Sequence, residues 1–218
     1  MRRFLFLIAL LLGTIAIAAT PALTPKDLNH RAMHEVLIIR GAESGWCTSE
    51  AIGPHTILIA EHCIGQNAKP ASALITVDPV TDAKVAVNGE VIYDGMDHAI
   101  IELQHLNVGN SFVAFDQFIA PAPVAPRAGS RAYYFAAPKS LACVDCYFEG
   151  VAVGTFQDPD TGQSGMWYST GGAPGCSGAA MFDEQDRLIG VVSISYSGMV
   201  GGFDLHFTEA QWKAARAL

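Results

Sequence analysis

GCSG at residues 175–178 and, far upstream, IAEHC at residues 59–63 are the two stretches that decide the fold and function expected of this chain. Glycines flank Ser177 closely, and they can form a tight turn that exposes its hydroxyl group. A distant histidine such as His62 can supply the base that makes this hydroxyl nucleophilic. Together the two stretches indicate a serine hydrolase.

The first 18 residues have the pattern of a secretory signal peptide. Arg2 and Arg3 precede an apolar run over residues 4–12, and residues 16–18 form a small-x-small cleavage site. We expect the mature chain to begin at Ala19, to be secreted or periplasmic, and to have no stable membrane insertion. A membrane anchor is the alternative, but a spanning helix needs roughly 20 apolar residues, and the apolar stretch from Phe4 to Ala19 has 16.

The composition of the mature chain argues against some classes of partner. Without residues 1–18 the chain has 11 basic and 21 acidic residues, a formal charge of −10. Binding to a phosphate backbone depends on clustered Lys and Arg, so nucleic acid is not an expected partner. No cofactor is expected either. The sequence does not define an oligomeric state.

Cysteine usage agrees with an oxidising compartment, in which disulfides persist. The five cysteines are Cys47, Cys63, Cys143, Cys146 and Cys176, so at least one is unpaired within a monomer. The CVDC stretch ending at Cys146 permits two interpretations, half of a zinc site or a short-loop disulfide. No second CxxC or matching pair of histidines completes a zinc site. We therefore favour the Cys143–Cys146 disulfide and expect no metal.

Short apolar runs separated by Gly, Pro, Asn and Asp recur along the mature chain. This pattern predicts many short strands and is typical of an all-β barrel or sandwich. The expected strands are residues 36–39, 56–60, 73–77, 84–87, 99–103, 132–135, 150–156, 166–169, 188–194 and 202–206.

Two helices are predicted near the ends of the mature chain. Residues 24–25 provide a helix cap and a first-turn proline. Residues 208–211 have a capping-box pattern that opens a helix extending to Leu218. Phe207 and Trp212 are available to dock this second helix.

The strand pattern stops between residues 116 and 131, where Pro121, Pro123 and Pro126 lie in an Ala-rich stretch typical of a linker. His62 falls before this stretch and Ser177 after it. A site built from both would lie in the cleft between two units, a common place for pockets. The predicted divisions are a signal peptide (1–18), an N-terminal segment with a first β-barrel (19–115), the linker (116–131), and a second β-barrel with the C-terminal helix (132–218).

Three motifs resemble one known family. They are WCT at 46–48 with ILIAEHC at 57–63, DHAIIEL at 97–103, and GCSGAAMF at 175–182 with LIGVVS at 188–193. Their residues and order resemble the chymotrypsin-like (trypsin-fold) serine peptidases, in particular the compact bacterial secreted members. The order His, Asp, Ser also differs from that of subtilisins and α/β-hydrolases. The resemblance runs from about residue 36 to residue 218.

The resemblance implies an all-β fold of two antiparallel six-stranded β-barrels with a C-terminal helix. Cys47 and Cys63 are 16 residues apart, the spacing of the family's histidine-loop disulfide, so the resemblance also implies that they are paired. It implies a polypeptide substrate and chemistry without a metal or organic cofactor.

The resemblance further implies a role for each residue of the site. Ser177 would be the nucleophile, His62 its general base, and Asp97 the group that orients the imidazole. The backbone N–H groups of Gly175 and Ser177 would form the oxyanion hole. Asp94 is a competing acid, but the apolar strand pattern follows only Asp97.

Cys176 departs from the pattern of many animal members of the family. Those members have an aspartate at this position, which pairs with a new N-terminus after zymogen cleavage. No IVGG start is visible near residues 30–40 either, so we do not expect maturation by that switch. Cys176 is also an alternative nucleophile, as in viral cysteine relatives, although the motif places the nucleophile at Ser177. Ala179 and Ala180 replace the usual Gly-Pro.

Substrate specificity is only weakly indicated. Gly171 lies six residues before Ser177, where the family has the base of its primary pocket, and the absence of an acid there argues against a preference for Arg or Lys. Ser193 and Ser195 would contribute small, neutral walls. Ser193 also matches the family's serine that often contacts the aspartate.

Three functions remain open at this stage. The first is an exported serine endopeptidase that works through an acyl-enzyme intermediate. The second is a catalytically weak or inactive peptide-binding protein of the same fold, and the third an esterase that uses the same triad. Because inactive relatives usually lack a member of the triad, the presence of all three residues favours the endopeptidase.

Overall fold

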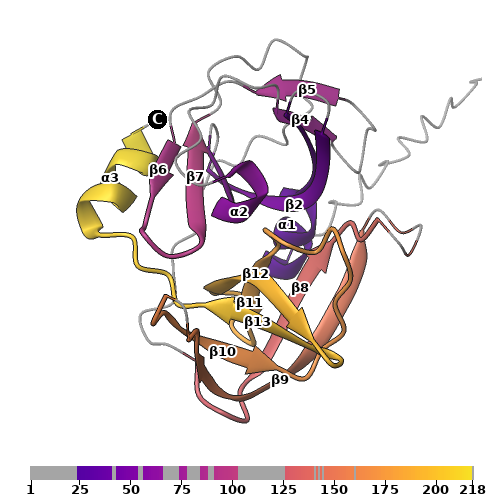
Figure 1. Ribbon diagram of the computed structural model, residues 1–218, viewed down its shortest axis with the longest axis vertical. Coiled ribbons are helices and arrows are strands. Elements are labelled where there is room, and N and C mark those ends of the chain that lie inside the picture. Colours follow the sequence, from indigo (N-terminus) through magenta and orange to yellow (C-terminus); the bar gives the residue numbers. More distant parts are fainter. Residues whose placement is uncertain are drawn as a thin grey trace, which may run out of the picture.

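Two β units stack on each other, the N-terminal one at the top of Figure 1 and the C-terminal one at the bottom. This architecture confirms the predicted all-β class. The predicted signal peptide and most of the predicted linker lie outside the described residues, and the predicted boundaries stay predictions. The computed structural model describes residues 24–40, 43–53, 56–65, 74–77, 84–87, 91–102, 126–139, 141, 143, 145–159 and 161–217.

The N-terminal unit is an antiparallel seven-stranded sheet in the order β5-β4-β1-β2-β3-β7-β6. The prediction was six strands in a closed barrel, whereas the described residues give seven strands in this open order. The strand β3, which lies between β2 and β7, is buried throughout, which explains its continuous apolar sequence. The elements are β1 (Met33–Arg40), β2 (Glu43–Gly53), β3 (Thr56–Ala60), α2 (Glu61–Ile64), β4 (Leu74–Val77), β5 (Lys84–Val87), β6 (Val91–Tyr93) and β7 (His98–Glu102).

The C-terminal unit is a closed six-stranded barrel in the order β10-β13-β12-β11-β8-β9, as predicted. All of its strand pairs are antiparallel. The elements are β8 (Arg131–Ala136), β9 (Cys146–Gln157), β10 (Ser164–Tyr168), β11 (Ala180–Asp183), β12 (Leu188–Tyr196) and β13 (Met199–Phe203).

One hydrophobic cluster is shared between the two units. Ile57 and Ile100 of the sheet belong to the same buried cluster as Phe182, Leu188 and Val191 of the barrel. A second cluster fills the barrel itself. Because this cluster contains side chains of both units, it fixes how the sheet and the barrel stack on each other.

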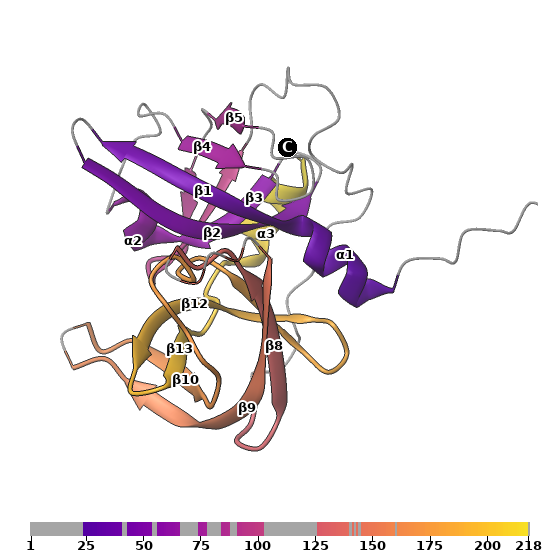
Figure 2. The ribbon, with the colours of Figure 1, turned by 90° about the vertical axis from the view of Figure 1, so that its right-hand side faces the viewer.

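The helix α1 (Pro25–Ala32) precedes the sheet but docks on the barrel. The predicted cap is present, with Thr24 and Asp27 forming a capping box. Asn29 Nδ2 donates to the Tyr133 hydroxyl at 2.9 Å, and Lys26 Nζ lies 4.0 Å from the centroid of the Tyr147 ring. The N-terminal helix therefore links the two units (Figure 2).

The helix α3 (Glu209–Ala217) follows the barrel but packs beside β6 of the sheet (Figure 1). Gln211 N donates to Thr208 Oγ1 at 3.2 Å and Thr208 N to Gln211 Oε1 at 2.8 Å, which is the predicted capping box. Phe207 and Trp212 are buried, with ring centroids 5.1 Å apart. The chain thus crosses from one unit to the other at both ends.

Four elements were not among those predicted, namely β2, β6, β11 and α2. In β2 three consecutive buried residues, Thr48, Ser49 and Glu50, are polar, and they interrupt any apolar run that would mark the strand. Among the described helices, none is long and apolar enough to cross a membrane.

Candidate active site

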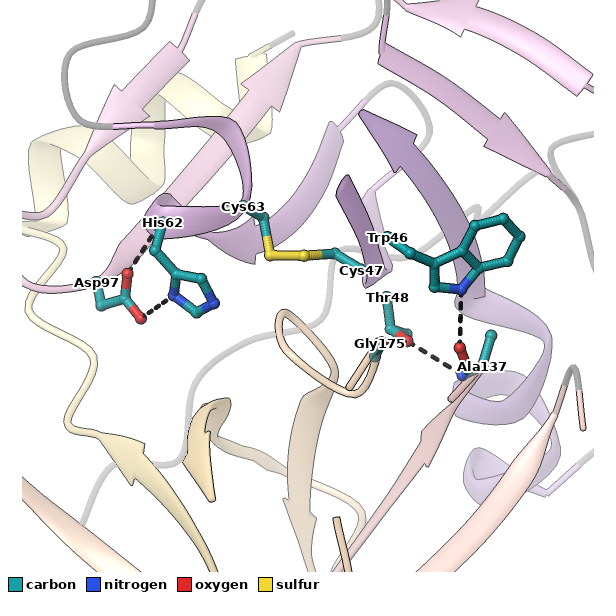
Figure 3. The surroundings of a disulfide bond; sticks show 8 residues. All are labelled: Trp46, Cys47, Thr48, His62, Cys63, Asp97, Ala137 and Gly175. Atoms are coloured by element: carbon teal, nitrogen blue, oxygen red, sulfur yellow. Dashed lines mark hydrogen bonds and ion pairs between the residues drawn. A yellow bond between two sulfur atoms is a disulfide. The ribbon is translucent and has the colours of Figure 1, made fainter. Parts of the chain in front are cut away.

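His62 lies on α2, the short helix that begins where β3 ends. A disulfide and a backbone hydrogen bond help to hold this helix. The Cys47–Cys63 disulfide ties it to β2 (Figure 3), and Glu61 N–H donates to the Asp97 carbonyl at 2.9 Å. The imidazole is therefore carried by a segment fixed on both sides.

The Asp97 carboxylate contacts His62 with both of its oxygens (Figure 3). Oδ1 accepts from the His62 backbone N–H at 2.9 Å, and Oδ2 lies 2.7 Å from His62 Nδ1. A carboxylate accepts hydrogen bonds, so it favours the tautomer with the proton on Nδ1. Nε2 is then free to act as a base, and the His62 side chain is 45% exposed whereas that of Asp97 is 16% exposed.

Asp94, the competing acid, has a different histidine partner. Its Oδ2 lies 2.6 Å from His98 Nδ1, and both side chains are fully buried. Burial raises the pKa of Asp94, but the hydrogen bond from His98, with the backbone N–H groups of His206 and Met96, outweighs it and lowers the pKa below the ordinary value. Asp94 is therefore engaged away from His62.

Ser177 lies on a turn whose carbonyl groups are all bound. The four consecutive carbonyls from Pro174 to Ser177 each accept a hydrogen bond of 2.7–3.0 Å. The donors are Lys139 N to Pro174, Thr48 Oγ1 to Gly175, Ala179 N to Cys176 and Thr48 N to Ser177.

The N–H groups of this turn alternate between bound and free. Cys176 N–H donates to Ala173 at 3.0 Å and Gly178 N–H to Val192 at 2.8 Å. The N–H groups of Gly175 and Ser177 make no hydrogen bond among the described residues. These are the two donors expected to form the oxyanion hole, and such donors act on a substrate oxygen when no protein group occupies them.

The two glycines of the turn are required by backbone angle and by space. Gly175 has φ +105° and Gly178 φ +89°, values that side chains disfavour. A Cβ atom on Gly175 would lie 2.9 Å from the Ala137 carbonyl oxygen, and one on Gly178 would clash with the Thr48 carbonyl oxygen.

Gly178 also shows how closely the turn approaches the His62 segment. A Cβ atom on Gly178 would lie 3.2 Å from the backbone N of Ala60, two residues before His62. Thr48 N–H binds the Ser177 carbonyl from the same side. No hydrogen bond joins the His62 ring to Ser177 among the described residues, as is common in substrate-free sites.

Cys176 points into the barrel and away from the site. It is a free cysteine with an exposed fraction of 1%, and it belongs to the barrel cluster. Burial raises the pKa of its thiol, although hydrogen bonds with Ala173 and the Tyr134 hydroxyl oppose this. Since the thiolate is the reactive form, this environment argues against Cys176 as the nucleophile.

Of the three residues expected in the primary pocket, Gly171 and Ser195 lie at the surface and Ser193 is buried. A Cβ atom on the neighbouring Gly172 would lie 3.6 Å from Ser195 Cβ, so these two segments adjoin. Ser193 Oγ donates to the Val191 carbonyl at 3.4 Å and makes no hydrogen bond with Asp97 among the described residues.

Cys143 and Cys146 form a disulfide at the start of β9, which is the favoured interpretation of the CVDC stretch. Within the described residues, no group of three or more His, Cys, Asp or Glu side chains has an arrangement that holds a metal.

The sequence did not single out Thr48, Ala137 or Lys139, all of which contact the turn. Trp46 Nε1 donates to the Ala137 carbonyl at 2.9 Å, and Ala137 N–H donates to Thr48 Oγ1 at 3.1 Å. Thr48 belongs to the WCT stretch at residues 46–48, in which the family resemblance assigns a role only to Cys47. Nothing in the sequence alone indicates that Ala137 and Lys139 lie beside Gly175.

The fold and the site geometry together define a protein with the trypsin-like serine protease fold, and comparison with solved structures confirms the fold. The Rv3671c protease from M. tuberculosis, in its active form, is similar with a TM-score of 0.67 and 13% identity over 87% of this chain and 82% of that chain. A Glu endopeptidase in complex with MPD is similar with a TM-score of 0.61 and 20% identity over 87% of this chain and 92% of that chain.

A serine endoprotease from Yersinia pestis is a third example, with a TM-score of 0.58 and 15% identity over 83% of this chain and 61% of that chain. At these identities the likeness concerns the fold alone. No family model and no curated protein sequence matches the chain.

Proposed function

We propose that this chain is an exported serine endopeptidase that hydrolyses peptide bonds with Ser177, His62 and Asp97 through an acyl-enzyme intermediate. The observation that carries the proposal is the double contact of Asp97 with His62. Beside it is a turn whose Gly175 and Ser177 N–H groups make no hydrogen bond within the described part of the chain. The protease structures of the same fold support a polypeptide substrate.

In this proposal the Ser177 hydroxyl attacks the scissile carbonyl carbon, and its proton passes to His62 Nε2. The N–H groups of Gly175 and Ser177 stabilise the oxyanion of the tetrahedral intermediate. His62 then protonates the departing amine, which leaves Ser177 acylated. Water attacks the ester with His62 again as base, and this releases the acid and restores Ser177.

The environment of the two neighbouring side chains supports Ser177 over Cys176. Ser177 is half-buried, whereas the Cys176 thiol is in the barrel core. Gly171 leaves the base of the proposed primary pocket uncharged, which supports a neutral side chain on the substrate.

Labelling with a fluorophosphonate tests this function. We expect the purified mature protein to form an adduct that maps to Ser177, and we expect it to cleave a peptide library. Ser177→Ala should abolish both, whereas Cys176→Ala should still be labelled. A label that survives Ser177→Ala and is lost in Cys176→Ala would overturn the serine assignment. Cleavage of ester but not peptide substrates would favour an esterase.

A further inference from the structure

Thr48 lies on β2, directly after Cys47, and its side chain is fully buried. Its hydroxyl accepts a hydrogen bond from Ala137 N–H at 3.1 Å and donates one to the Gly175 carbonyl at 2.7 Å. An N–H can only donate, so the hydroxyl proton remains available for Gly175. Figure 3 shows Thr48 above Gly175, with Ala137 beside them.

The same residue holds the turn a second time through its backbone. Thr48 N–H donates to the Ser177 carbonyl at 2.8 Å. Of the four bound carbonyls from Pro174 to Ser177, the second and fourth are thus held by one residue of the N-terminal sheet. The remaining two are held by backbone N–H groups of the C-terminal unit, Lys139 and Ala179.

We propose that Thr48 is a positioning residue for the oxyanion hole, which it fixes through the orientation of the Gly175 carbonyl. The inference rests on the proposed function, because it assigns a role within the same site. Thr48 does not contact the substrate in this role. It acts through the peptide that joins Gly175 to Cys176, which lies between the two peptides that carry the Gly175 and Ser177 N–H groups. A change in ψ of Gly175 or in φ of Cys176 would alter how these two N–H groups are oriented relative to each other.

Loss of the hydroxyl would leave two buried groups without partners. Ala137 is fully buried and Gly175 is buried. Neither the Ala137 N–H nor the Gly175 carbonyl can therefore form a hydrogen bond with water without moving. A buried polar group without a partner is costly. Since Gly175 has no Cβ atom, a change in its ψ, which rotates the unpartnered carbonyl, is the least hindered response.

Matched variants at this position separate positioning from packing. Thr48→Val removes the hydroxyl and keeps the shape, while Thr48→Ser keeps the hydroxyl and removes a methyl group. Both retain the backbone bond to Ser177. We expect kcat to fall roughly 10- to 100-fold in Thr48→Val, a smaller loss than deletion of an oxyanion donor, with KM nearly unchanged. Thr48→Ser should retain most of the wild-type kcat.

An NMR measurement tests the inference independently of turnover. We expect the Gly175 and Ser177 amide resonances to shift in Thr48→Val and to stay near their wild-type positions in Thr48→Ser. Wild-type-like kcat and unshifted amides in Thr48→Val would overturn the inference. Should Thr48→Val not fold, Thr48→Ala takes its place. A wild-type protein that neither cleaves nor labels would refute the proposed function, and the amide resonances would still decide whether Thr48 orients the turn.

Discussion

Asp97 holds His62 at two points, with Oδ1 on the backbone N–H at 2.9 Å and Oδ2 on ring Nδ1 at 2.7 Å. The first contact positions the helix α2, and the second favours the tautomer that leaves Nε2 as the base. Because different oxygens serve the two contacts, a substitution can remove one and keep the other.

Asp97→Asn should reduce kcat about 10⁴-fold near neutral pH, with little loss of stability. The remaining amide oxygen can still accept the His62 backbone N–H, but the amide group donates toward Nδ1 and favours the wrong tautomer. Steady-state kinetics and thermal unfolding measure the two effects. Asp94→Asn is the control, since Asp94 binds His98. It should lower stability much more than Asp97→Asn does, and equal kinetic losses in both variants would contradict the assignment.

Cys176 should be inert in the folded protein. With 1% exposure and a pKa raised by burial, its thiol should not react with iodoacetamide under native conditions at mildly alkaline pH. After unfolding without reductant, one thiol per chain should react, because two disulfides pair the other four cysteines and only Cys176 is free. Rapid native alkylation that abolishes activity would instead indicate an accessible thiol at the site.

Gly178→Ala should destabilise the protein by more than the cost of its backbone angle, which is about 1–2 kcal/mol. Gly178 has φ +89°. A Cβ atom at this position would also clash with the Thr48 carbonyl oxygen and lie 2.9 Å from Ile59 Cγ1. Gly129→Ala is the matched control, because Gly129 has φ +88° and no atom within 4 Å of such a Cβ atom. Urea denaturation of both variants separates the clash from the angle. Equal losses would show that the turn and the sheet are not in close contact.

The sequence predicted the parts of this fold and site that depend on short motifs. Five of the six barrel strands, the capping box at residues 208–211 and the Asp97–His62 pair all follow from residues close together in the chain or from a motif with a fixed order. The bonds from Thr48 to Gly175 and Ala137 join residues 127 and 89 positions apart. Such contacts exist only once the two units have stacked, so no local pattern indicates them.

Buried polar residues account for most of the remaining differences between the predicted and the observed structure. His98 is the first residue of β7 and lies outside the predicted strand 99–103, and its side chain is fully buried beside Asp94. Glu50 is fully buried on β2, and neither of its carboxyl oxygens has a hydrogen-bond partner among the residues that the structure describes. Hydrophobic periodicity places acids at the surface, and so it does not predict either arrangement.

Glu50 should make the stability of the protein fall as pH rises. Burial raises the pKa of its carboxyl well above the ordinary value of 4.5. Above pH 4.5 the unfolded chain therefore releases a proton that the folded protein keeps. The folded state binds more protons in this window, so the free energy of unfolding decreases with rising pH until Glu50 ionises in the folded protein.

Glu50→Gln removes this contribution, because glutamine has no proton to lose. Relative to the variant, wild-type stability should fall by up to about 1.4 kcal/mol per pH unit within the window. Urea denaturation of both proteins at several pH values measures this difference. Glu184→Gln, at an exposed acid, is the control and should track the wild type.

Asp94 and Asp183 do not obscure the effect. Their hydrogen-bond partners lower their pKa values despite burial. The stability that they contribute is therefore lost only as pH falls below their ordinary pKa of 3.8. A constant difference between wild type and Glu50→Gln from pH 4.5 upward would mean that Glu50 is ionised in the fold and has a partner that neutralises it.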